Sequence, residues 1–232
     1  MTRGCRAAAF ALLALTVLVA SAPGVVAAGG DAPGTLQGNV EPAVEAGHEG
    51  QVAVVASGAP LRNAVPVVVS NGTDHDVTGV RVTAVATDAA GGSAVRAVTG
   101  VVPATLAPGE LAVGRVNFGH ATVGPKLTFS VASRSSGSAV DRAALDVSGL
   151  RLSSPATGPV AERLALTVRN PQRRTVDGPV RVTVMCFDEA RRPVFLATAT
   201  VKTAHLRRGA TVRASVPLTE LCPSYLAGAR GR

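Results

Sequence analysis

The chain of 232 residues contains two copies of one sequence pattern, about 100 residues apart. The stretch "VRVTAVATDAAGGSAV" at 80–95 aligns with "VRVTVMCFDEARRPVF" at 180–195, and "VVVSNGTDHDVTG" at 67–79 aligns with "LTVRNPQRRTVDG" at 166–178. A repeat of this length is too long for one unit of a solenoid and matches a small domain. The sequence therefore predicts two tandem copies of one domain.

Apolar and polar residues alternate over short stretches within each copy. In the second copy, one face of the stretch 180–187 consists of Val180, Val182, Val184 and Cys186. Period two is typical of a β-strand with one face inward, and short strands with a turn about every 8–12 residues indicate an antiparallel sandwich. We therefore predict an all-β fold with two immunoglobulin-like β-sandwiches, at 49–146 and 147–232. The Gly-, Pro- and acid-rich residues 29–48 predict a disordered lead-in.

The first 28 residues predict a secretory signal peptide that is cleaved after Ala28. Arg3 and Arg6 precede an apolar run of 14 residues at 7–20, and small residues lead up to Ala28. This order is typical of an exported protein, and the run is too short to cross a bilayer comfortably. No later stretch approaches about 18 consecutive apolar residues. We therefore expect a secreted, extracellular protein, associated with the cell envelope, that has no transmembrane anchor after cleavage.

Two cysteines, Cys186 and Cys222, remain after the predicted cleavage. Export places them in an oxidising compartment, where a pair of cysteines forms a disulfide by default. Cys186 continues the inward face of its strand, and no histidine lies near it in sequence to activate a catalytic thiolate. We therefore predict a structural disulfide that ties the C-terminal segment to the sheet. Two unpaired thiols and a metal site are the alternatives.

The second copy resembles the FxLyD domain, a small extracellular module of bacteria. The pattern is a strand ending in Asn, an alternating strand that runs into an aromatic residue and Asp, and Leu-x-x-Gly before a last strand. In this chain those features fall on Asn170, Phe187, Asp188, Leu206 and Gly209. The first copy has Asn71, Asp88, Leu106 and Gly109, but Thr87 replaces the aromatic residue. Bacterial adhesion modules of the CARDB type share much of this pattern. The resemblance implies an accessory or binding role and carries no active site.

Several classes of function are not supported by the residues. The histidines are scattered, at His48, His75, His120 and His205, and the DHD at 74–76 lacks the longer run of oxygen ligands that calcium takes. Neither a GxSxG motif nor a phosphate-binding GxxxxGK[ST] motif occurs. One tyrosine and no tryptophan leave no platform for stacking single-stranded nucleic acid. We predict a protein that is not an enzyme, has no metal or cofactor and does not bind nucleic acid.

Positive charge is concentrated in the second copy. Residues 150–232 contain 14 basic and 5 acidic residues, a net charge of +9, whereas residues 29–149 contain 7 and 10, a net charge of −3. In an up-and-down order of strands, the loop with Arg173 and Arg174 and the loop with Arg207 and Arg208 leave the sheet at the same end. Four guanidinium groups there can bind phosphate or carboxylate polymers. A solvated face, or a contact with an acidic loop of the first copy, is the alternative.

These observations predict a non-catalytic binding or spacer protein of the cell envelope that contacts anionic wall polymers through Arg173, Arg174, Arg207 and Arg208. The alternative is an accessory or inhibitor protein that docks on another exported protein through an edge strand or a loop end.

Overall fold

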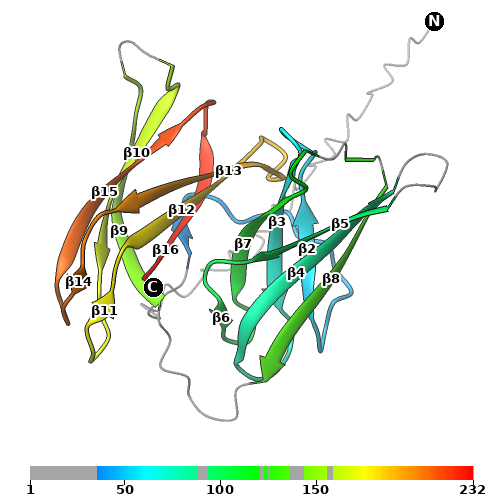
Figure 1. Cartoon of the computed structure of the whole chain (residues 1–232), viewed down its shortest axis with the longest axis horizontal. Coiled ribbons are helices and arrows are strands. Elements are labelled where there is room, and N and C mark those ends of the chain that lie inside the picture. The colour runs from blue at the N-terminus through cyan, green and yellow to red at the C-terminus, as the bar shows by residue number, and fades with distance from the viewer. Residues whose placement is uncertain are drawn as a thin grey trace, which may run out of the picture. The chain divides into compact units, whose positions relative to one another are not determined.

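The computed structural model describes residues 36–231 except 88–93, 121–122, 125, 136–143 and 156–158. All regular structure in the described residues is β-strand, and the paired strands are antiparallel (Figure 1). The predicted all-β fold is therefore confirmed. The predicted signal peptide at 1–28 lies outside the described residues.

The first half of the fold consists of two sheets built from β2 to β8. One sheet has the order β2-β3-β7, and in the other β4 lies between β5 and β8, with β6 beside the start of β4. The strands are β2 (Val52–Ser57), β3 (Ala64–Asn71), β4 (Val77–Thr87), β5 (Ala94–Gly100), β6 (Thr105–Leu106), β7 (Leu111–Asn117) and β8 (Lys126–Ser135). Valines such as Val67, Val82 and Val116 fill the core of this half because alternate side chains of these strands point inward.

The second half repeats most pairings of the first. Its strand groups β9-β10-β15 and β13-β12-β16 correspond to the two sheets of the first half, and β11 pairs with β14 as the start of β4 pairs with β6. Unlike the first half, the two groups join in one continuous sheet, because the end of β16 pairs with the start of β9. The strands are β9 (Ala144–Ser153), β10 (Glu162–Arg169), β11 (Val176–Asp177), β12 (Val180–Phe187), β13 (Pro193–Val201), β14 (His205–Leu206), β15 (Thr211–Leu218) and β16 (Ser224–Arg230). Because β9 begins at Ala144, the predicted boundary between residues 146 and 147 falls inside a strand.

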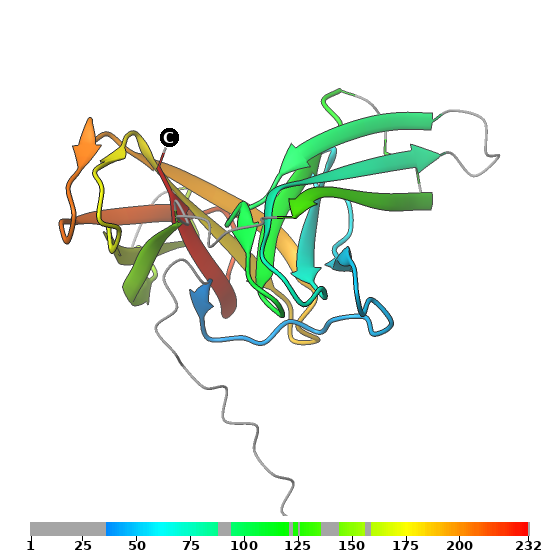
Figure 2. The same cartoon turned by 90° about the horizontal axis from the view of Figure 1, so that it is seen from below.

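Part of the segment that was predicted to be a disordered lead-in, from Leu36 onward, is described by the structure and includes a short strand. Gln37–Gly38 forms β1 on the edge of β16, which Figure 2 shows in blue beside the red strand. The Asn39 side chain then accepts a hydrogen bond from the backbone of Tyr225 at 2.8 Å and donates one to the carbonyl of Pro223 at 2.9 Å. Composition indicates disorder here, but a free strand edge offers backbone partners that order a polar segment.

Residues from both halves form one additional apolar cluster, the shared cluster. Met185, Phe187, Leu196 and Leu226 of β12, β13 and β16 pack with Val55, Ala56, Val68 and Val113 of β2, β3 and β7. These residues lie on the outer faces of their sheets, since the inner faces form the cores of the two halves. Asp31–Arg232 accordingly forms one compact unit.

Cys186 and Cys222 form the predicted disulfide, with their Cα atoms 5.4 Å apart. The bridge precedes β16, which the sequence pattern does not identify as a strand and which pairs with β12 over its whole length. In the first half Ala86 occupies the position of Cys186 and is also buried. The backbone N–H of Cys222 also donates to the carboxylate of the buried Glu162 at 2.6 Å. The C-terminal segment is thus held by a covalent bond, a strand ladder and a buried carboxylate.

Candidate anion-binding end of the second half

The two arginine-bearing loops of the second half lie side by side. One follows β10 and contains Arg173 and Arg174, and the other follows β14 and contains Arg207 and Arg208. The strands β11 and β14 bring them together, because Val176 is paired with Leu206 in the ladder. We call these four arginines the basic end.

A buried asparagine, Asn170, connects the backbones of the two loops. Its Nδ2 donates to the carbonyl oxygens of Arg174 and Leu206, both at 2.8 Å, and its Oδ1 accepts from the backbone N–H of Gln172 at 2.9 Å. The backbone carbonyl of Asn170 accepts from the N–H of Gly209 at 2.7 Å. Gly209 has a φ of 72°, a conformation that glycine adopts without a steric penalty. The loops that carry the arginines are therefore anchored at both ends.

The side chains of the basic end are all exposed. Arg174 Nε lies 3.4 Å from the Oε1 of the buried Gln172, which orients this guanidinium group. Among the described residues, no ion pair involves Arg173, Arg207 or Arg208. Guanidinium groups bind oxyanions bidentately, and the anchored backbones of these loops lower the cost in loop entropy of such binding.

A carboxylate and a histidine lie next to the basic end. Asp177 of β11 and His205 of β14 are opposite each other in the ladder, and His205 Nδ1 lies 2.9 Å from Asp177 Oδ1. Asp177 is the one carboxylate in β11 and β14, and its side chain contacts His205. Sequence reasoning missed this pair, because the two residues are 28 positions apart and only the ladder register aligns them.

The arginines at the opposite end of the second half have a different environment. Arg192 forms an ion pair with Asp188, with Nη2 3.1 Å from Oδ2, and its backbone N–H donates to Oδ1 at 2.8 Å. The backbone hydrogen bond from Arg192 is the main cause that lowers the pKa of Asp188. The turn at 188–192 thus neutralises one of its own arginines.

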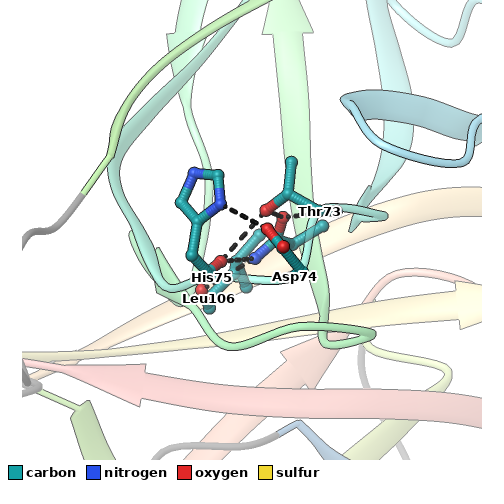
Figure 3. A network of polar contacts seen from close by, with 5 residues as sticks. Thr73, Asp74, His75 and Leu106 are labelled. Atoms are coloured by element: carbon teal, nitrogen blue, oxygen red, sulfur yellow. Dashed lines mark hydrogen bonds and ion pairs between the residues drawn. The ribbon is translucent and has the colours of Figure 1, made fainter.

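The first half has the same loop anchor but opposite charge. Asn71 is buried and donates to the carbonyl oxygens of His75 at 2.9 Å and Leu106 at 3.1 Å. Figure 3 shows this loop, in which His75 points toward Asp74 with Nδ1 2.9 Å from Oδ1, and Thr73 belongs to the same network. The hydrogen bond from His75 is the main cause that lowers the pKa of Asp74. Because the Asp74 side chain is 98% exposed and contacts His75, it makes no contact with the basic end.

Replacing Asn170 by Ala is expected to lower the free energy of unfolding by about 2–3 kcal/mol, since buried carbonyl and N–H groups lose their partners. Asn71→Ala should have a similar cost, because the repeat uses the same bonds in the first half. Asn117→Ala is the control: its Oδ1 accepts one exposed hydrogen bond, from Gly119. Chemical denaturation of the three variants measures these costs. Equal stability of N170A and N117A would contradict the anchoring role.

Neither a metal cluster nor a membrane helix occurs in the part of the chain that the structure describes. No three of its His, Cys, Asp and Glu residues are grouped so that they could hold a metal ion. None of its residues forms a helix that is long and apolar enough to cross a membrane. The residues of the basic end are thus the described group with the clearest binding chemistry.

Comparison with known proteins adds no further assignment. No family model matches the chain, and no curated protein matches it. The functional proposal is therefore based on the geometry of the anchored loops.

Proposed function

We propose that this protein is a non-catalytic, secreted binding or spacer protein of the bacterial cell envelope, built from two immunoglobulin-like modules of the FxLyD or CARDB kind. It contacts an anionic envelope polymer through the basic end, Arg173, Arg174, Arg207 and Arg208. The observation that carries this proposal is the Asn170 anchor, which joins two exposed, arginine-bearing loops.

The charge distribution supports a polymeric anion as the ligand. The second half has the excess of basic residues, and the neighbouring carboxylate Asp177 is occupied by His205. Repeated phosphate or carboxylate groups along a polymer engage several guanidinium groups at once, which raises the avidity. The first half, with Asp74 in the equivalent loop, then acts as a spacer.

The disulfide supports export. Disulfides persist in oxidising compartments outside the cytoplasm, and the bridge between Cys186 and Cys222 holds the last strand of the second half. Together with the charged and apolar leader at 1–20, this is the pattern of a secreted protein.

A sedimentation experiment with purified cell wall tests the proposed function. Replacing the four arginines of the basic end by Ser is expected to weaken wall binding at least about tenfold, since several charge-assisted hydrogen bonds are lost. Binding of the unmodified protein should also weaken as salt rises from low to physiological concentration.

The matched control replaces four other exposed arginines of the second half by Ser, Arg151, Arg163, Arg169 and Arg213. This variant has the same net charge as the basic-end variant, so we expect it to retain most of its wall binding. An equal loss in both variants would show that overall charge, and not the basic end, causes binding. Salt-resistant, stoichiometric capture of one exported protein from culture fluid would instead support docking on that protein.

A further inference from the structure

Polar residues form two rows across the outer face of the sheet β13-β12-β16. In the first row, Arg181 of β12 is opposite Thr200 of β13 on one side and Arg230 of β16 on the other. In the second row, Thr183 is opposite Thr198 and Gly228. The row after these is apolar and belongs to the shared cluster. The outer face therefore changes from apolar to cationic along the strands.

A cavity of about 310 Å³ lies over these two rows. The opposite wall comes from β5 and β7 of the first half and includes Thr99 and Arg115. A second cavity, of about 620 Å³, shares Arg181, Thr200 and Arg230 with the first. We call the two cavities together the arginine groove. Of the residues that the structure describes, no acidic residue lines either cavity.

The two arginines of the first row are placed unfavourably unless a counter-charge is present. Like charges directly opposite each other on neighbouring strands destabilise a sheet. Arg181 is exposed, but Arg230 is partly buried, and water screens the repulsion less on that side. Burial is the main cause that lowers the pKa of Arg230, and the charge of Arg181 lowers it further. Guanidinium groups nevertheless stay protonated in proteins, so both remain charged. Among the described residues, no ion pair involves Arg115, Arg181 or Arg230.

The groove contains the donors that an oxyanion requires. Two guanidinium groups on neighbouring strands supply forked N–H donors, and Thr183, Thr198 and Thr200, whose hydroxyl groups are further donors, line the same cavity. Backbone curvature or a helix end is not needed for such a site, because the ladder register itself sets the spacing of the two arginines.

We propose that the arginine groove binds an oxyanion group, a phosphate or a carboxylate, between Arg181 and Arg230. The bound anion offsets the repulsion of the two guanidinium groups and occupies part of the cavity that lies between β12, β13 and β16 on one side and β5 and β7 on the other. This site shares no residue with the basic end, so it is a second binding site in addition to the proposed wall contact.

Calorimetric titration of the whole protein with inorganic phosphate, and separately with citrate, tests this site at a constant ionic strength set with sodium chloride. The unmodified protein should bind at least one of the two anions, and its unfolding temperature should rise with the anion concentration. Binding of phosphate alone assigns a phosphate group, binding of citrate alone a carboxylate, and binding of both a general oxyanion site. Binding of neither would overturn the proposal.

The variants Arg181→Gln and Arg230→Gln should each lower the affinity for the anion at least about tenfold, because each removes one of the two guanidinium groups. The control Arg213→Gln removes an exposed arginine of β15 and should bind as the unmodified protein does. In buffer without a multivalent anion, R181Q should unfold at the same or a higher temperature than the unmodified protein, since the repulsion is gone. Lower stability of R181Q in that buffer, or equal anion affinity of R181Q and R213Q, would overturn the proposal.

The four-serine variant of the basic end separates the two proposals. It should retain phosphate or citrate binding in the groove while it loses wall binding. Loss of both activities in that variant would place anion binding at the basic end and contradict the groove site. Loss of wall binding in R181Q together with intact wall binding of the four-serine variant would contradict the proposed function and leave the groove site standing.

Discussion

Phe187→Ala is expected to lower the free energy of unfolding by about 3–5 kcal/mol, the range found when a buried phenylalanine is truncated. Phe187 is 1% exposed and belongs to the shared cluster, where it packs with residues of β2, β3 and β7. In a free second half its side chain would lie on the outer face of β12 and face water. The large cost therefore depends on the packing of the first half against this sheet.

Denaturant unfolding of three variants measures this cost. Phe187→Leu keeps most of the apolar volume and should cost less than about 1.5 kcal/mol. Val98→Ala is the control for an apolar side chain on an uncovered surface, because Val98 is 52% exposed, and it should cost little. A cost of F187A close to that of V98A would mean that the outer face of β12 is solvated, and the shared cluster would be wrong.

Removing the disulfide with the double substitution Cys186→Ala and Cys222→Ala should lower the free energy of unfolding by about 3–4 kcal/mol. The two residues are 36 positions apart, and closing a loop of that length restricts the unfolded chain by about this amount in the chain-entropy description. Alanine fits at position 186, since Ala86 occupies the equivalent buried position of the first half. The loss therefore reports the cross-link more than the packing.

A reductant provides the matched control for the disulfide. It should destabilise the unmodified protein by a similar amount and leave the double variant unchanged, because the variant has no bond to reduce. Unfolding followed by circular dichroism, with and without reductant, makes the comparison. An equal effect of the reductant on both proteins, or a double variant as stable as the unmodified protein, would contradict a stabilising cross-link.

The prediction that both arginine-bearing loops lie at one end of the sheet used only the order of the strands along the chain. The structure explains why strand order was enough to place the two loops. Loops that follow β10 and β14 leave at one end because β11 and β14 pair in register. The bonds of Asn170 that hold the loops, and the contact between Asp177 and His205, join residues distant in sequence. No local sequence pattern predicts such pairs. The sequence therefore predicted that the two arginine-bearing loops share one end of the sheet, but not the hydrogen bonds that anchor them.

The arginine groove was out of reach of sequence reasoning for a related reason. Arg230 lies in β16, and the tail that contains this strand has no period-two run of large apolar residues to mark it. Its position opposite Arg181 follows from the pairing of β16 with β12, which the disulfide next to the strand supports. Within the predicted lead-in, Gln37–Gly38 pair with that same strand, so their order could not be predicted without it.

The amino-acid sequence by itself determined the strands of the repeat, their inward faces and the pairing of the two cysteines. The strands follow from local alternation, which acts on short stretches of chain. The cysteine pairing was expected because only two cysteines remain after the predicted leader. Only the tertiary structure decided what covers the other faces. Alternation assigns Met185 and Phe187 to the outer side of β12, but it does not say whether water or another sheet lies there. The packing of β2, β3 and β7 on that side buries both residues and leaves Arg181 in the groove.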